Sequence, residues 1–511
     1  MNSNDMYVWL SYLITGITFF AIMFFPLFRL RKIITLQGDP RFNESYIGVD
    51  GYGGVKMNEM SSEPTRLALS SAILKGSRFR RQILASAGDI HRAVSPECSI
   101  NMRLLHRVCS YMEDREFRYQ LVYTVLLPVF PLVAPLHIFK GYVERFRIAK
   151  MFSRDVFDED IVKEKFPEVG SDSIVNIADA RQNVVIYKGF LPFAFAGINL
   201  GGWSIALDLN RAKYNISGVR EAPKKVTLSK LYERMEKKLL TLGIQGLSIR
   251  NYLFIPGHDV PKDSDFLPDK FGAPVQVVEE AIMDSHIEGN DSRVRYYKWI
   301  RIDEWGGDLT LSMFVRFSIT GTNLFVELSQ LVLTPPAQEY RDVDNDPSMD
   351  LLSKIFWGLG RMLSSPFAAL ASPFHLMSRI SIRAFKSLGL LEKSLKREIL
   401  LNPLFDFGAK ESLRSRMTAP KYINYFQKMD SSRNLKVMEQ QILDAIVDVL
   451  DEHGVDTSEI KERKSTILNN GILVQHGDVT AQAIAVGSRA RAATGFSNFR
   501  KGNSEAPIGD K

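Results

Sequence analysis

The sequence predicts an α+β fold, with an N-terminal transmembrane helix, a mostly antiparallel β-sheet domain and a helical C-terminal region. An uncharged apolar run over residues 7–28 has the length of about 20 residues that crosses a bilayer as a helix. Between residues 174 and 334, strand-like segments alternate with turn signals, and the last three segments, over 294–333, are joined by turns that are too short for parallel crossovers. After residue 340 the apolar residues recur mostly at helical spacing, which favours helices in the C-terminal part.

The run 7–28 is predicted to be a permanent anchor, with Trp9, Phe19 and Phe24 in the membrane. It is longer than the apolar part of a signal peptide and lacks an A-x-A cleavage site. Arg29, Arg31 and Lys32 follow it, whereas only Asp5 and the terminal amine precede it. The positive-inside rule therefore places the N-terminus outside the cell membrane and the bulk of the chain in the cytoplasm.

Composition gives a formal net charge of +7 and a pI near 9.1. Either anionic lipid or nucleic acid attracts such a chain. The apolar runs favour lipid, and the interleaved basic and aromatic residues of RNA readers are absent. Cys98 and Cys109 lack the spacing of a metal or redox pair, so they are expected to be reduced structural thiols.

A second apolar run covers residues 121–139 and contains Pro128, Pro131 and Pro135. Three prolines make a straight helix doubtful, and basic residues flank the run on both sides. A shallow membrane hairpin with both ends in the cytoplasm is the favoured interpretation. A second membrane span and a buried core segment are the alternatives.

The sheet domain is read from alternating apolar residues and turn signals. In residues 309–317 the odd positions are apolar, while Thr310, Ser312 and Arg316 fall on the other face, which is expected to meet water. One helix, over residues 228–242, has apolar residues at spacings of three and four. The expected strands are 184–187, 203–209, 247–255, 294–305, 309–319 and 324–333, the last three forming a meander.

Two segments outside the sheet domain are strongly basic. Residues 65–84 have a helical pattern that predicts a surface helix or a helix pair, with a basic end at Arg78, Arg80 and Arg81 that is expected to be solvated. Residues 351–397 carry eight basic residues and one acidic residue. Within the latter, an apolar stripe over 377–391 and a basic stripe predict a helix lying in the lipid headgroups. The alternative is an amphipathic helix packed on the sheet domain. The predicted lipid-binding residues are Arg379, Arg383, Lys386, Trp357, Phe367 and Phe374.

At the C-terminal end, residues 435–449 approximate a heptad seam over two heptads, for which local packing is the default and a partner helix the alternative. Short apolar pieces broken by turns follow over residues 466–487. Because such pieces bury little alone, they are predicted to form an oligomerisation or docking element, most stable when stacked against other copies of the chain. Residues 496–511 are polar and expected to be disordered.

No motif for a known reaction is present, no metal site is predicted, and no cofactor is expected. The sequence therefore predicts a membrane-anchored, non-enzymatic protein whose cytosolic α+β domain binds a partner or ligand and which self-assembles at the inner leaflet or perturbs it. The expected partners are membrane lipids and further copies of the chain, and no nucleic acid is expected to bind. The alternatives are a membrane-tethered enzyme with a site around residues 258–269, and an accessory subunit of a transporter. The predicted regions are an anchor (1–32), a helical linker (33–120), the hairpin (121–139), the α+β domain (140–340), the basic segment (341–400), a helical region (401–455), a β-rich tail (456–495) and a disordered end (496–511).

Overall fold

The structure, a computed structural model, describes residues 63–469 except 155, 169–175, 215–220, 262–263, 290, 345–350, 388, 403 and 410. The apolar run 7–28, with Trp9, Phe19 and Phe24, lies outside the described residues. No helix within the described part of the chain is both long and apolar enough to cross a bilayer.

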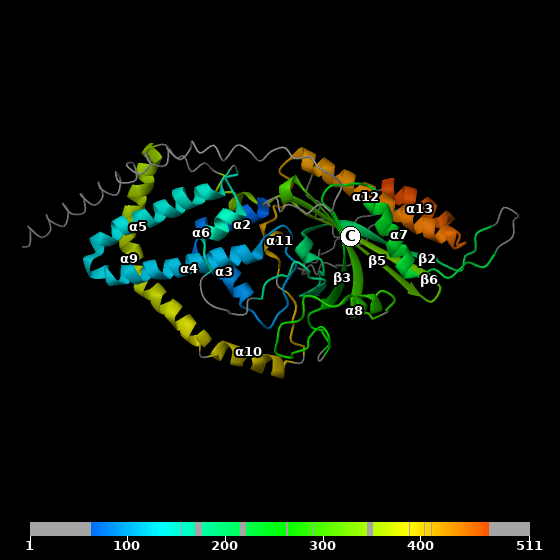
Figure 1. Cartoon of the computed structure of the whole chain (residues 1–511), viewed down its shortest axis with the longest axis horizontal. Helices are drawn as coiled ribbons and strands as arrows, with labels where there is room; N and C mark the ends of the chain where they lie inside the picture. The colour runs from blue at the N-terminus through cyan, green and yellow to red at the C-terminus, as the bar shows by residue number, and fades with distance from the viewer. Residues whose placement is uncertain are drawn as a thin grey trace, which may run out of the picture.

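The central element is a six-stranded mixed sheet with the order β1-β3-β4-β5-β6-β2, and the α+β prediction is confirmed at this level (Figure 1). The predicted meander is present as β4, β5 and β6, each pair antiparallel. β1 instead pairs in parallel with β3, which makes the sheet mixed. The strands are β1 (Val184–Tyr187), β2 (Ile198–Asp208), β3 (Leu247–Pro256), β4 (Arg295–Glu304), β5 (Leu309–Thr320) and β6 (Asn323–Leu333).

Strand β5 is buried on both faces along most of its length, so the expectation that Thr310 and Ser312 face water is wrong. The hydroxyl of Thr310 donates to Asp303 at 2.7 Å, and the indole N–H of Trp299 donates to Ser312 at 3.0 Å. These bonds satisfy polar groups that would otherwise be costly to bury. Apolar and polar residues do alternate along β5, but the face with the polar residues is covered by aromatic side chains such as Phe193 and Phe195.

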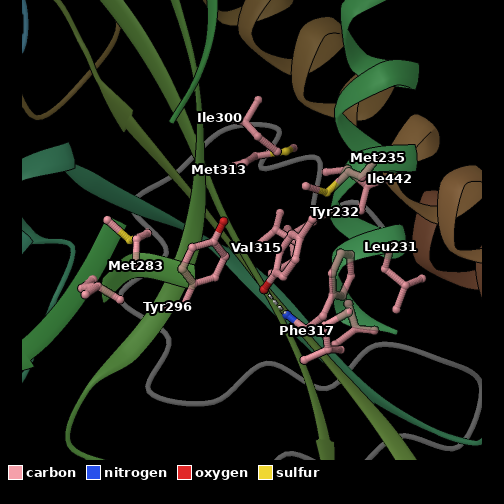
Figure 2. Packing of buried hydrophobic residues seen from close by; sticks show 14 of the residues in the cluster. Leu231, Tyr232, Met235, Met283, Tyr296, Ile300, Met313, Val315, Phe317 and Ile442 are labelled. Atoms are coloured by element: carbon pink, nitrogen blue, oxygen red, sulfur yellow. Dashed lines mark hydrogen bonds between the residues drawn. The ribbon is translucent and has the colours of Figure 1, made fainter. Parts of the chain in front are cut away.

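One face of the sheet is covered by α7 (Leu228–Leu240) and α12 (Tyr425–Glu452). Figure 2 shows Leu231, Tyr232 and Met235 of α7 against β5, with the Tyr232 hydroxyl accepting from the backbone N–H of Phe317 at 2.8 Å. The seam of α12 is buried in this same core, so its apolar residues serve local packing. Residues 458–469, predicted as part of the β-rich tail over 456–495, instead form helix α13 (Ser458–Asn469). The rest of that tail lies outside the described residues, and self-association there stays a prediction.

A helical unit occupies the other end of the molecule (Figure 1). Of the two alternatives predicted for residues 65–84, the structure has the helix pair, and Gly76, with φ +82°, separates the two helices. Arg80 is buried and its Nε lies 2.8 Å from Glu113, so the expectation that it belongs to a solvated basic face is wrong. The helices are α2 (Glu63–Leu74), α3 (Ser77–Ala87), α4 (Met102–Val125), α5 (Val133–Tyr142) and α6 (Glu159–Lys165).

Between the sheet and α12 the chain returns to the helical unit as the long helix α9 (Leu351–Ser387), followed by α10 (Leu390–Leu401) and α11 (Leu413–Met417). Gly389 is left-handed, with φ +62°, and begins α10. The predicted stripe over 377–391 is therefore interrupted before Leu391. α9 packs against α4 and α5 rather than on the sheet, and Figure 1 shows it crossing both helices at the far end of the molecule.

Candidate membrane-contact surface

Helix α9 carries a row of large apolar side chains that no described residue covers. Their exposed fractions lie between 61% and 76%, and they recur every three, four or seven residues, which places them on one face of a helix. At 1.5 Å per residue, the 37 residues of α9 give a helix of about 55 Å. We call this row the α9 stripe: Phe356, Leu363, Phe367, Leu370, Phe374 and Met377.

The opposite face of α9 is built from small residues and lies against α4 and α5. Ser365, Ala369 and Ser372 are almost fully buried, and the hydroxyls of Ser372 and Thr124 are 3.2 Å apart. Gly141 of α5 lies so close to α9 that a Cβ atom there would sit 2.8 Å from Arg361 Nε. The absence of a side chain at Gly141 therefore leaves room for the Arg361 and Trp357 side chains of α9.

Two prolines inside α9 are accommodated by the serines that precede them. Pro366 cannot donate to the carbonyl of Met362, four residues earlier. The Ser365 hydroxyl donates to that carbonyl at 2.8 Å, and Ser372 donates in the same way to Ala369 at 2.7 Å, ahead of Pro373. Ser-Pro-Phe therefore occurs twice, seven residues apart, with serine inside and phenylalanine outside. A serine hydroxyl replaces the lost donor where water is excluded.

Buried charges fix α9 to the hairpin. The Arg379 guanidinium lies 3.0 Å from the Glu113 carboxylate on α4 and donates to the Glu113 carbonyl at 3.1 Å. Lys140 of α5 pairs with Glu116 of α4. Burial by itself raises the pKa of Glu116, but the contact with Lys140 more than offsets this, and the pKa is lowered from its ordinary value. Glu116 therefore stays charged at neutral pH, and the two helices are joined by an ion pair.

The run 121–139 forms the end of α4, a short 3₁₀ turn over residues 127–132, and most of α5. Pro128 lies in that turn and is exposed. Pro135 is in the first turn of α5, where a missing N–H costs no helical bond, and the side chain of Pro131 is not described. The helical hairpin exposes apolar side chains near its tip, namely Leu121, Val122, Val125, Val129, Leu132 and Phe139.

The predicted lipid-binding residues differ in their exposure to solvent. Phe367 and Phe374 are exposed in the α9 stripe. Trp357 is partly covered, because its ring meets Phe146 edge-on at 5.4 Å. Arg379 is buried in its ion pair with Glu113, so the prediction that it binds lipid headgroups is corrected. Arg383 and Lys386 lie in the last turns of α9, and their side chains are not described.

Other cations do reach solvent near this surface. Lys354 near the start of α9, and Lys393 and Arg397 on α10, are exposed. Arg361 is not among them, because its Nη1 lies 3.1 Å from His137 Nε2 and its guanidinium stacks 5.6 Å from the Trp357 ring. Sequence reasoning missed Glu113, Gly141 and Ser365, which hold α9 in place. The Ser-Pro-Phe repeat was the signal in the sequence that could have found Ser365.

The polar loop around residues 258–269 does not gather its acidic residues. His258 Nε2 is 3.8 Å from Asp259, and both side chains are well exposed. Asp269 accepts from the backbone N–H of Phe271 at 2.9 Å, which shapes a turn, and Asp263 is not described. Throughout the described ranges, no group of three His, Cys, Asp or Glu residues could hold a metal ion.

Fold and surface together define an α+β protein with an apolar helical face at one end. The chain belongs to the AbeC-like domain family, whose family model matches residues 202–481, more than half of the chain. This match includes α9 and most of the sheet but not the α4–α5 hairpin. No curated protein and no solved structure matches the chain.

Proposed function

We propose that this chain is a membrane-associated, non-enzymatic protein that lays the α9 stripe and the tip of the α4–α5 hairpin on the inner leaflet of the cell membrane. The α9 stripe is the observation that carries the proposal. Six large apolar side chains exposed along one helix form a continuous surface of the kind that marks interaction sites. The sheet domain would remain in the cytoplasm, available to a partner or ligand.

A bilayer is the favoured occupant for three reasons. The stripe runs from Phe356 to Met377, about 33 Å along the helix, as in helices that lie in the plane of a membrane interface. Lys354 near the start of α9 and Lys393 and Arg397 on α10 are exposed cations near this surface, which suits an anionic leaflet. The apolar run 7–28 is expected to anchor the same chain in a membrane.

The test must distinguish contact by α9 from simple tethering through residues 7–28. Cys98 and Cys109 are buried, so a cysteine introduced at Phe374 can be labelled selectively with a polarity-sensitive fluorophore. We expect the emission of the full chain to shift to the blue when the detergent-solubilised protein is reconstituted into vesicles containing anionic lipid. Leu240→Cys, at an exposed apolar position on α7 near the sheet, is the matched control and should not shift.

Two outcomes would contradict the proposal. A fluorophore at Phe374→Cys that stays water-like in reconstituted vesicles would show that α9 does not meet lipid. A blue shift that appears in lipid-free detergent solution as protein concentration rises would assign the stripe to contact between copies of the chain instead.

A further inference from the structure

A polar cleft of about 610 Å³ lies between the helical unit and the sheet, open to solvent. One wall comes from residues 96–103, which lead into α4, and the other comes from β3 and β4. Clefts between two packed units are common places for ligands, and this volume lies in the range of small-molecule sites. The cleft shares no residue with the α9 stripe, so this inference is independent of the proposed membrane contact.

Three guanidinium groups line the cleft. Arg103 is exposed in the first turn of α4, and Arg250 on β3 donates to the Ala180 carbonyl at 2.8 Å. Arg301 on β4 lies 2.6 Å from Asp303 and stacks 5.5 Å from the Trp299 ring. Its Nε is buried without a hydrogen-bond partner among the described residues. Arginine clusters of this kind recognise carboxylate and phosphate groups.

The N-terminus of α4 adds to this positive potential. Asn101 caps the helix by accepting from the Leu104 N–H at 3.1 Å, whereas the N–H groups of Met102 and Arg103 have no acceptor within the helix. No acidic residue stands in the first turn of this 24-residue helix. The positive end of the helix dipole therefore faces the same cleft as the arginines.

Acidic residues also line the cleft, but each already has donors of its own. Glu97 accepts from the backbone N–H groups of Leu413 and Arg414 at 2.6 and 3.1 Å. Glu159 accepts from Asn101 at 2.7 Å, and Asp179 lies 3.3 Å from Arg181 outside the cleft. These carboxyl groups therefore take their hydrogen bonds from groups other than Arg103, Arg250 and Arg301.

Two further features mark the cleft. Gln182 is 3% exposed, and its amide nitrogen donates to the carbonyls of Val94 and Val184, which fixes the orientation of the amide. Its oxygen is buried without a partner among the residues described. Ser99 has a left-handed backbone, with φ +57°, a strained conformation that occurs preferentially at functional sites.

We propose that this cleft binds a small organic acid, a carboxylate or a phosphate monoester, that also carries a hydroxyl or amine donor. Arg103, Arg250 and Arg301 would hold the acidic group together with the start of α4. The hydroxyl or amine of the ligand would donate a hydrogen bond to the Gln182 amide oxygen after a small movement of the residues that line the cleft.

Isothermal titration of the full chain in detergent, at fixed ionic strength, tests this with two probes. Malate represents the carboxylates and adenosine monophosphate the phosphate monoesters, so the two arms separate the two chemistries. We expect saturable one-site binding of at least one probe. Loss of a charge-assisted hydrogen bond in Arg103→Ala or Arg250→Ala should weaken binding about tenfold.

Arg293→Ala is the matched control, because Arg293 is an exposed arginine at the far end of β4, outside the cleft. It should bind the probe as the unmodified chain does. The proposal is overturned if neither probe binds, or if the control loses affinity as much as the cleft variants. A circular dichroism spectrum unchanged by the substitutions, both at exposed positions, confirms that the variants are folded.

Discussion

The guanidinium of Arg379 on α9 lies 3.0 Å from the carboxylate of Glu113 on α4, and both side chains are buried. Glu113 also holds Arg80 of α3, so one carboxylate joins three helices. This ion pair lies on the side of α9 opposite the stripe. α9 is thus fixed to the body by charge on one face while its other face remains apolar and uncovered.

Removing Arg379 should destabilise the helical unit. Arg379→Ala leaves part of the buried Glu113 charge without its partner, and breaking a buried pair in this way costs about 3 kcal/mol. Arg118→Ala is the control, because Arg118 forms an exposed pair with Asp114 on the same helix α4 that contributes about 0.5 kcal/mol. Urea unfolding of the full chain in detergent measures the loss of unfolding free energy in each of these two variants. Equal effects of the two substitutions would contradict the role given to Arg379.

The serine before each proline of α9 should contribute to stability through its hydroxyl. Ser365→Ala leaves the Met362 carbonyl without a donor and should cost about 1 kcal/mol. Adding Pro366→Ala restores a backbone N–H and should recover that loss. Ser364→Ala is the control, since its acceptor, the Arg361 carbonyl, can receive the ordinary helical bond from the Ser365 N–H. The unfolding free energies of these three variants and of the unmodified chain test this prediction. A double variant that recovers no stability would refute the compensation.

Substitution of a glycine in α5 and of a glycine in α9 should change the stability of the chain in opposite directions. Gly141→Val places carbon atoms within 3 Å of the Arg361 and Trp357 side chains and should cost about 2 kcal/mol through overpacking. Gly358→Ala meets open space in α9 and should stabilise the helix by about 0.5 to 1 kcal/mol. Thermal unfolding gives both values, and destabilisation by Gly358→Ala would mean that this part of α9 is covered.

Stability should also depend on the protonation of Glu97. Burial raises its pKa from 4.5 to about 7, although the N–H groups of Leu413 and Arg414 favour the charged form. The folded state therefore binds more protons than the unfolded state between these pH values, and the free energy of unfolding falls as pH rises through this window. The Glu97→Gln variant has no carboxyl group to titrate at this position, so it does not lose this stability. The free energy of unfolding of the variant, relative to that of the unmodified chain, should therefore increase by about 3 kcal/mol from pH 5 to pH 8. If the unfolding free energies of the variant and the unmodified chain changed with pH in parallel, the raised pKa of Glu97 would be contradicted.

The local pattern of the sequence predicted much of the sheet. Alternating residues and the turns at Gly306 and Gly321 define β4, β5 and β6, because hairpin neighbours are also neighbours in sequence. The parallel pairing of β1 with β3 was not predictable in this way, since Val184 pairs with Leu253, about 70 residues further along the chain. No local signal encodes such a pairing.

Contacts between residues distant in sequence also explain why the predicted exposure of two arginines is wrong. Arg80 and Arg379 were assigned to exposed basic faces because an isolated arginine on a helix usually is exposed. Their common partner Glu113 is distant in sequence from both, so burial as an ion pair could not be read from periodicity. Phe367 and Phe374, which the sequence predicts to bind lipid, are both exposed, and their contact with lipid stays a prediction.

The two cysteines of the chain lie in different parts of the fold. Cys109 is packed in the core of the helical unit, and Cys98 lies among the aromatic residues on the sheet. Each thiol becomes reactive toward an alkylating reagent only when its own surroundings open. Timed alkylation followed by mass spectrometry would therefore record the opening of the two halves separately in one unmodified chain, and would reveal whether they unfold together or in sequence.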